Sequence, residues 1–201
     1  QRIAKLVDEN SFMEIGSLVT ARSTDFNLTA AKTPSDGVIT GHGLVNGSLV
    51  FIYSQDASVL NGTIGEMHAK KIVNVYNMAM KMGAPVIGLV DCGGIRLQES
   101  VDALEAFGQI YAKQVAASGI IPQICGIFGN CGGGLSVVPA LEVGAGSVVT
   151  VGAFVLPSGG LPLLQAERAK RRTRVDKISE IVFEDRILLP PLSVRFSELK
   201  K

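Results

Sequence analysis

The sequence predicts an α/β domain in which short buried strands alternate with helices. The main observation is a repeat. A helix, a glycine stop, a proline, a short apolar run and a Cys-Gly-Gly turn follow one another around residues 82–94 and again around residues 118–133. The composition agrees, because 47% of the 201 residues are hydrophobic and 23 are glycine, as in a globular core with many tight turns.

Charge and composition argue against several classes of protein. A formal net charge of +1 gives no electrostatic reason to expect a nucleic-acid partner. No apolar run reaches the roughly 18 residues of a membrane span, and the first residues do not lead us to expect a signal peptide. The three cysteines form no C-x-x-C pair and there are only two histidines, so we expect neither a disulfide framework nor a metal site. The predicted compartment is the reducing cytoplasm.

The N-terminal part of the chain predicts a short helix followed by a hairpin. Apolar residues at helical spacing predict a helix over residues 2–7, and the polar stretch 22–36 is expected to be a surface connection. An Asn-Gly pair at 46–47 separates the apolar runs 38–45 and 48–54. This predicts a two-residue β-hairpin, because both turn positions need a φ above zero.

Two amphipathic helices, each followed by a strand, are predicted next. The first helix covers residues 65–82 and the second about 101–118, each ending at a glycine. Short apolar runs at 85–90 and 124–128 then predict strands. The residues expected to face the core are Met67, Ile72, Val75, Met78 and Met82 on the first helix, and Leu104, Phe107, Tyr111 and Val115 on the second.

The two glycine-rich turns are the candidate functional feature. If the strands are parallel neighbours, both turns lie at the carboxyl edge of the sheet, where open α/β sheets bind ligands. Backbone N–H groups in such turns are suited to an oxyanion, such as a thioester enolate, or to a phosphate. The alternative is that the glycines serve only close packing of helix on sheet. Neither phosphate-binding glycine motif, G-x-x-x-x-G-K-[ST] or G-x-G-x-x-G, is present.

Several segments resemble the N-terminal half of the biotin-dependent acyl-CoA carboxyltransferases and occur in the same order and with the same spacing as in that family. The family includes the β subunits of propionyl-CoA and acetyl-CoA carboxylases and related decarboxylases. The resemblance covers about 140 of the 201 residues. The matching segments are Arg2–Leu6, Ser11–Gly16, Asp36–Gly41, Phe51–Asp56, Glu66–Ile72, Gly83–Ile87, Gly93–Glu99, Ala117–Ile124, Gly129–Gly134 and Pro139–Leu141.

The resemblance implies a crotonase-like ββα superhelix, incomplete in this chain, in which residues 1–141 form the acyl-CoA-binding domain. It also implies that backbone amides in the two turns hold the thioester oxygen as an enolate forms. Carried over by position, these amides belong to Gly93, Gly94, Ile95, Gly132, Gly133 and Gly134. The carboxyl group would be exchanged with carboxybiotin on a biotin carboxyl carrier protein. No protein nucleophile or metal is then required.

Individual side chains allow more than one interpretation. By resemblance, Arg96 helps to shape the CoA-binding surface, and the alternative is an ion pair with Glu99. Lys70 and Lys71 are candidates for CoA phosphates, although lysines on the polar face of a helix are usually only solvated. His68 lies in a family motif, where we expect a packing role in preference to acid–base catalysis.

The resemblance ends after residue 141, so residues 142–201 are unassigned. They contain an apolar, strand-like run at 147–156 and a basic run at 167–174, which we expect to be solvated. In the family a second, C-terminal-type domain or subunit binds carboxybiotin, and the site forms at a dimer interface. The resemblance therefore implies an oligomer and such a partner.

Two other functions stay open on the sequence. One is a non-catalytic scaffold or interaction subunit derived from the family. The other is a different crotonase-fold reaction on acyl-CoA, such as hydration of an enoyl-CoA. Hydration needs carboxylates beside the oxyanion donors, and Glu99 and Glu105 are the candidates near in sequence.

Overall fold

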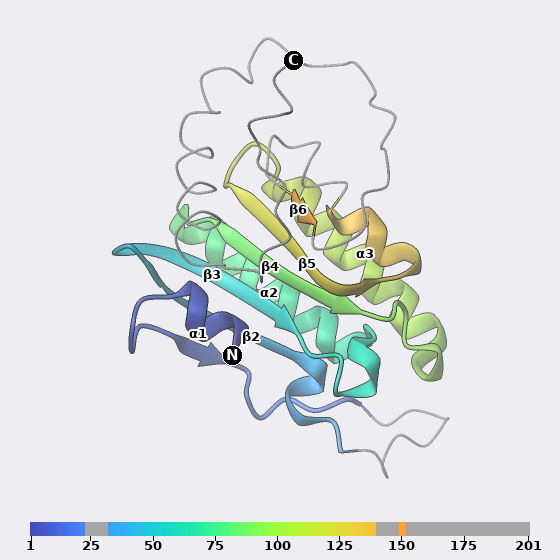
Figure 1. Cartoon of the computed structure of the whole chain (residues 1–201). Helices are drawn as coiled ribbons and strands as arrows, with labels where there is room; N and C mark the ends of the chain where they lie inside the picture. The colour runs from blue at the N-terminus through green and yellow to red at the C-terminus, as the bar shows by residue number, and fades with distance from the viewer. Residues whose placement is uncertain (23–31, 140–148, 152–201) are drawn as a thin grey trace, which may run out of the picture.

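The protein is described by a computed structural model covering residues 1–22, 32–139 and 149–151. Six strands form one mixed sheet in the order β1-β2-β3-β4-β5-β6 (Figure 1). The first three strands pair antiparallel, and β3 to β6 pair parallel, which confirms the predicted α/β class. The strands are β1 (Met13–Ile15), β2 (Val38–Val45), β3 (Ser48–Gln55), β4 (Val86–Cys92), β5 (Gln123–Cys131) and β6 (Val149–Val151).

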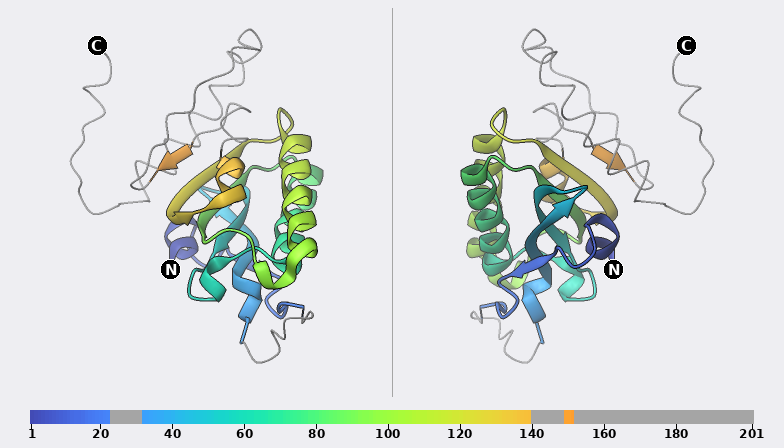
Figure 2. Two further views of the ribbon diagram at one scale, coloured as in Figure 1. Left: turned by 90° about the vertical axis from the view of Figure 1, so that its right-hand side faces the viewer. Right: turned by 90° about the vertical axis from the view of Figure 1, so that its left-hand side faces the viewer.

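Helices cover both faces of the sheet. The long helices α2 (Glu66–Met82) and α3 (Ser100–Ala117) lie side by side on one face, and the short α1 (Arg2–Leu6) lies on the other (Figure 2). Two hydrophobic cores result, a larger one beneath α2 and α3 and a smaller one beneath α1. Short 3-10 helices connect these elements: η2 (Pro34–Gly37), η3 (Leu60–Gly62), η4 (Leu97–Glu99) and η5 (Gly133–Ser136).

The hairpin between β2 and β3 forms as predicted. Its turn residues, Asn46 and Gly47, have φ values of 49° and 75°, the left-handed conformation that an Asn-Gly hairpin turn requires. Strand pairing is continuous from Val45 opposite Ser48 to Val38 opposite Gln55. Of the predicted surface connection at 22–36, residues 23–31 lie outside the described residues, as does most of the segment 142–201.

Helix α2 has the predicted bounds but a different buried face. Ile72 and Val75 are buried as expected, whereas Met82 is 65% exposed and Lys71, expected on the polar face, is 6% exposed. The helix approaches the sheet through small residues such as Ala69 and Ala79, both fully buried. The buried face of α2 is therefore rotated away from the methionines at the two ends of the helix.

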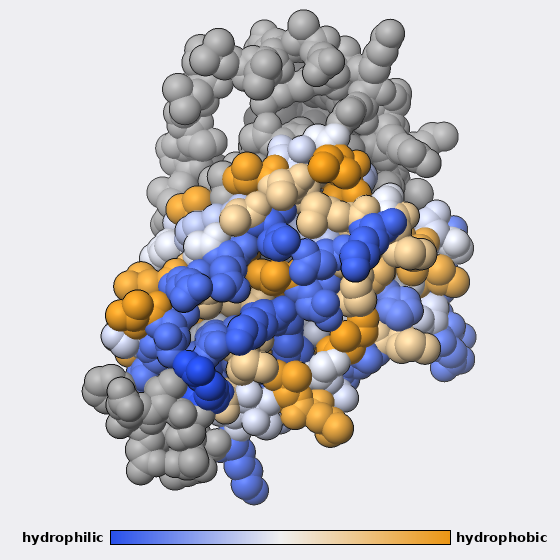
Figure 3. Space-filling view, turned by 180° about the vertical axis from the view of Figure 1, so that it is seen from behind, coloured by the Kyte–Doolittle hydropathy of each residue, from blue (hydrophilic) through white to orange (hydrophobic). Residues whose placement is uncertain are grey.

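Helix α3 is also rotated relative to the prediction. Leu104 and Val115, expected in the core, are 63% and 59% exposed. Three of the six buried residues of α3 are alanines, small side chains that suit its close contact with α2. Seen from the helical side, the middle of the molecule is largely hydrophilic and hydrophobic side chains gather toward the margins (Figure 3). The buried residues of α3 are Ala103, Ala106, Phe107, Ile110, Gln114 and Ala117.

The ends of β4 and β5 bring the two glycine turns to one edge of the sheet. Both strands extend beyond the predicted bounds, and Cys92 pairs with Cys131 after an irregularity in the register. The prediction that the turns are neighbours at the carboxyl edge is confirmed. Within the described residues, no helix combines the length and apolar character needed to cross a membrane.

Candidate functional site

The two glycine turns touch each other through their backbones. We call residues 92–95 the first glycine turn and residues 131–134 the second. A Cβ atom added to Gly132 would lie 3.1 Å from the carbonyl oxygen of Gly93, and one added to Gly94 would lie 3.3 Å from that of Gly132. Gly94 and Gly133 also have φ values of 114° and 58°, which strain any residue with a side chain. Both close packing and backbone conformation therefore require glycine here.

Three of the six predicted donors are already used inside the protein. The N–H of Gly93 donates to the carbonyl oxygen of Asn61 at 2.9 Å, and that of Gly132 to the carbonyl oxygen of Cys92 at 3.3 Å. The N–H of Gly94 donates to Sγ of Cys92 at 3.2 Å. These three groups hold the turns in shape.

The other three donors, the N–H groups of Ile95, Gly133 and Gly134, make no hydrogen bond to any described residue. Ile95 lies between two residues that bond to Ile64: the carbonyl oxygen of Gly94 accepts the Ile64 N–H, and the Arg96 N–H donates to the Ile64 oxygen, both at 2.9 Å. In extended backbone, alternate residues direct their N–H groups to opposite sides. The Ile95 N–H therefore faces away from Ile64.

The free donors of the second turn belong to the start of η5. Gly133 and Gly134 begin this short 3-10 helix, where the first N–H groups have no partner within the helix. The hydroxyl of Tyr111, on α3, donates a short hydrogen bond to the carbonyl oxygen of Gly134. The ring of Tyr111 also packs edge-on against Phe107, with ring centroids 5.9 Å apart. Helix α3 thus supports the second turn from beneath.

The cysteines of the two turns are not suited to nucleophilic catalysis. Burial raises the pKa of the Cys92 thiol to about 11, and burial also raises the pKa of Cys131. The nucleophilic thiolate form of each is therefore scarce near neutral pH. Cys92 Sγ instead accepts the N–H of Gly94.

Arg96 lies in a buried ion-pair network and not at the surface. Its side chain is 0% exposed, and Nη1 contacts Asp36 Oδ1 at 2.6 Å and Glu99 Oε1 at 2.8 Å. Nη2 donates to the carbonyl oxygen of Thr63 at 2.7 Å. The alternative of an ion pair with Glu99 is confirmed. A direct contact between this guanidinium and CoA is not compatible with its burial.

The two lysines occupy different environments. Lys71 is buried, and its Nζ donates to the carbonyl oxygens of Ser35 and Val38 and to the Ser35 hydroxyl. Its predicted place on a solvated face was wrong, because the rotation of α2 turns it inward. Lys70 is exposed and pairs with Glu66 at 2.6 Å. It lines a pocket between α2 and α3 together with Glu66, Asp102, Glu105, Ala106 and Gln109.

The carboxylates considered for hydration are both engaged in other contacts. Glu99 is buried, and its Oε2 accepts the N–H of Glu66 at 2.6 Å while Oε1 contacts Arg96. Glu105 lines the pocket between the helices and accepts a hydrogen bond from Gln109 at 3.3 Å. Neither arrangement places a free carboxylate at the unpaired N–H donors, so no described contact supports hydration.

His68 has a structural environment, as expected. Its side chain is fully buried, and burial, reinforced by the nearby Arg96 and Lys71 charges, lowers its pKa to about 3. Nδ1 lies 2.8 Å from the carbonyl oxygen of Asp36 and Nε2 lies 3.1 Å from Nε2 of Gln55. The ring is therefore neutral at physiological pH.

Two site residues were missed by the sequence interpretation. Asn61 accepts the Gly93 N–H from within η3, where Leu60, Asn61 and Gly62 have φ values of 46°, 55° and 65°. The adjacent Asn-Gly pair at 61–62 is the turn signal that marks this segment.

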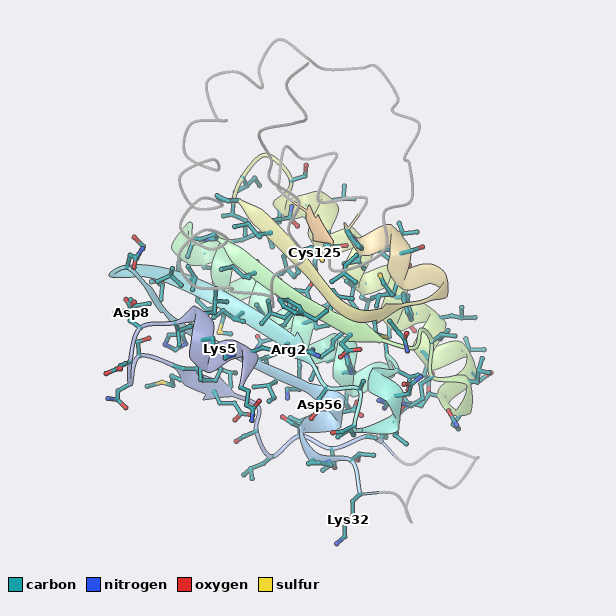
Figure 4. The ribbon with its side chains drawn as sticks, viewed as in Figure 1. Arg2, Lys5, Asp8, Lys32, Asp56 and Cys125 are labelled. Carbon is teal, nitrogen blue, oxygen red and sulfur yellow. The ribbon has the colours of Figure 1, made fainter. Side chains whose placement is uncertain are left out.

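The second missed residue, Asp91, joins the ends of β4 and β5. Its Oδ1 accepts the N–H of Asn130 at 3.3 Å, and its Oδ2 contacts Nη2 of Arg2 at 2.6 Å. Gly129 has no room for a Cβ atom because the Asp91 carboxylate lies against it. Figure 4 shows Arg2 on α1, lying over the sheet. In the sequence, the only signal for this role is that an acidic residue directly follows a predicted strand.

Comparison with known proteins finds a matching family model and similar enzyme subunits. The model of the carboxyl transferase domain matches residues 1–153. The α subunit of methylmalonyl-CoA decarboxylase from Veillonella parvula is 49% identical over 141 residues, and the propionyl-CoA carboxylase β chain from Roseobacter denitrificans is 48% identical over the same length. Each alignment covers 70% of this chain and 28% of the relative, so the chain spans little more than a quarter of these relatives.

Solved structures give the same result. Transcarboxylase 12S, a hexamer solved with methylmalonyl-CoA bound, matches with a TM-score of 0.71 and 37% identity over 75% of this chain and 28% of that chain. A malonate decarboxylase hetero-tetramer from Pseudomonas, in complex with malonate, matches with a TM-score of 0.66 and 27% identity over 75% and 56% of the two chains. These neighbours confirm the predicted crotonase-like fold class.

Proposed function

This chain belongs to the carboxyl transferase domain family, and from that premise we propose that it forms the acyl-CoA-binding part of a carboxyltransferase. The reaction proposed is transfer of a carboxyl group between carboxybiotin and the α-carbon of an acyl-CoA. The observation that supports the role of this chain is that the N–H groups of Ile95, Gly133 and Gly134, at two touching glycine turns, make no hydrogen bond to a described residue.

These N–H groups would hold the thioester oxygen of the substrate. When the α-carbon loses a proton or a carboxyl group, negative charge develops on that oxygen, and donors already in place stabilise it without reorganisation. A single such donor typically contributes about 2.7–4 kcal/mol to lowering the barrier. The paired donors of Gly93, Gly94 and Gly132 keep a supporting role in this proposal, since their hydrogen bonds fix the turns.

We assign the described residues to the binding of acyl-CoA and not to the binding of biotin. The unpaired N–H donors suit the anionic oxygen of a thioester, and we assign no residue of this chain to the ureido group of carboxybiotin. We propose that a biotin carboxyl carrier protein delivers that group and that a C-terminal-type domain or subunit binds it, so that the active enzyme is an oligomer. Among the predicted CoA contacts, exposed Lys70 is the one that we retain. The cytoplasm stays the predicted compartment.

The proposal is tested by calorimetric titration of acetyl-, propionyl- and malonyl-CoA into the purified chain. The variant Gly133→Val should lose saturable binding, because a β-branched residue strains the φ of 58° and displaces the two free N–H groups. Gly47→Val is the matched control: it has a φ of 75° and, like Gly133, no atom within 4 Å of an added Cβ, but it lies in the hairpin turn.

We expect the wild type and Gly47→Val to bind and Gly133→Val not to bind. Thermal unfolding of all three proteins checks that each is folded. Absence of binding to folded wild-type protein, or equal binding by both variants, would contradict the proposal. Equal binding would place the acyl-CoA elsewhere in the chain.

A further inference from the structure

A buried chain of hydrogen bonds joins the two ends of the first glycine turn. It begins at Asp91, directly before the turn, whose N–H donates to Gln55 Oε1 at 3.2 Å. Gln55 Nε2 lies 3.1 Å from His68 Nε2, and His68 Nδ1 lies 2.8 Å from the carbonyl oxygen of Asp36. Asp36 Oδ1 contacts Arg96, directly after the turn, at 2.6 Å. We call these five residues the polar ring.

The direction of every hydrogen bond in the polar ring follows from its partners. The carbonyl oxygen of Asp36 can only accept, so Nδ1 of His68 must be the protonated nitrogen. Nε2 of the neutral imidazole is then an acceptor and accepts a hydrogen bond from the amide nitrogen of Gln55. This leaves Oε1 of Gln55 facing the Asp91 N–H, which can only donate. One tautomer of His68 and one orientation of Gln55 satisfy all partners.

The side chains of four of the five residues of the polar ring are shielded from water, and Asp91 takes part through its backbone N–H. His68, Asp36 and Arg96 are 0% exposed and Gln55 is 2% exposed. A buried polar group that loses its partner costs about 1–3 kcal/mol. Other side-chain conformations in the polar ring would leave such groups unpaired, so the observed arrangement is strongly favoured over them. The side chain of Asp36 is fixed further, because its Oδ2 accepts a hydrogen bond from the backbone N–H of His68 at 2.7 Å.

We propose that the polar ring is a positioning device that fixes the direction of the Ile95 N–H, with Gln55 and His68 as its positioning residues. Two glycines give residues 92–95 the conformational freedom to present their N–H groups in several directions. The ring anchors the residue on each side of that segment to the same buried histidine. The purpose assigned to the ring rests on the proposed function, since the Ile95 N–H is one of the three donors for the thioester oxygen.

The test compares two buried glutamines. Gln55→Met retains the length and burial of the side chain and removes both of its hydrogen bonds in the ring. Gln114→Met is the matched control on α3: Gln114 is 1% exposed and its amide donates to the Tyr76 hydroxyl at 3.4 Å, outside the ring. For each variant we would record the backbone amide NMR signal of Ile95 in the free protein, the affinity for propionyl-CoA and the thermal midpoint.

We expect Gln55→Met to shift the Ile95 amide signal and weaken propionyl-CoA binding on the order of tenfold or more. Gln114→Met should leave both unchanged even where it lowers the thermal midpoint to the same extent. Should Gln55→Met fail to fold, Gln55→Glu is measured instead. Glutamate retains the acceptor for the Asp91 N–H but not the donor to His68, so an Ile95 shift is still expected.

The NMR signal separates this inference from the proposed function. If wild-type protein binds no propionyl-CoA, the proposed function fails, while a shift of Ile95 in Gln55→Met alone would still support positioning of the turn. An unchanged Ile95 signal in a folded Gln55 variant would overturn the positioning role. Equal effects of the Gln55 and Gln114 substitutions on binding would also overturn it, because general destabilisation would then explain both.

Discussion

Replacement of Arg96 by methionine should destabilise the protein far more than replacement of a second arginine with a similar set of partners. Arg96 contacts two carboxylates, those of Asp36 and Glu99, and all three side chains are 0% exposed. Arg22 also contacts two carboxylates, those of Glu66 and Asp102, but it is 53% exposed. Burial is therefore the main difference between the two sites.

The expected magnitudes follow from this difference. Removing one partner of a buried ion pair leaves an uncompensated charge and costs about 3–5 kcal/mol. Exposed ion pairs contribute about 0.2–1 kcal/mol each. Arg96→Met should thus lower the free energy of unfolding by about 3–5 kcal/mol, a large share of the roughly 5–15 kcal/mol typical of a domain. Arg22→Met should lower it by about 1 kcal/mol or less, since its pairs are solvated.

Urea-induced unfolding followed by circular dichroism at pH 7 measures both changes. Burial raises the pKa of Asp36, so this carboxyl group takes up a proton more readily in the folded Arg96→Met variant than in its unfolded chain. Stability of the variant should therefore recover in part as pH falls from 7 toward 5. Similar losses for the two arginine variants would refute the reasoning, because the burial of Arg96 would then have no energetic consequence.

Three further outcomes are expected. Because His68 has its pKa lowered to about 3, it takes up a proton in the unfolded chain but not in the folded protein between about pH 6.5 and 3. Its contribution to stability is complete above pH 6.5 and is lost as pH falls, so urea titrations should show a weaker pH dependence for His68→Gln than for wild type. Iodoacetamide at pH 8, followed by mass spectrometry, should label Cys92 in the native protein at least tenfold more slowly than in urea, since burial raises its pKa to about 11; rapid native labelling would contradict this. Tyr111→Phe should lower the free energy of unfolding by about 0.5–1.5 kcal/mol through loss of the hydrogen bond to Gly134, and a neutral result would show that the bond has no net value.

The sequence predicted local structure well where one residue type determines the backbone. The Asn-Gly turn at 46–47, the helix stop at Gly83 and the paired glycine turns all appear at the predicted positions. Each depends on a left-handed backbone conformation or on a strand of limited length. Such constraints act within a few residues and are visible in a single sequence.

Helix orientation was predicted less well, because it depends on partners distant in sequence. Lys71 and Leu104 were assigned to the wrong environments, since alanines such as Ala69 and Ala103 occupy buried positions of the two helices in place of some larger apolar residues. The contacts of Gln55 and Asp91 were also not predicted, because their partners are as many as 89 positions away along the chain. Periodicity alone does not indicate such contacts.

The proposed function assigns oxyanion binding to main-chain N–H groups at the glycine turns, and this affects how the site can change during evolution. Every residue except proline has such a group, so replacing the Ile95 side chain changes the shape of the surroundings but does not delete the donor. The glycines are the sensitive positions, because their φ values and close contacts admit no side chain. Under the proposed function, the acyl group accepted can thus diverge by side-chain substitution around a fixed set of donors, and directed evolution of substrate preference should begin at residues near the turns and leave the glycines untouched.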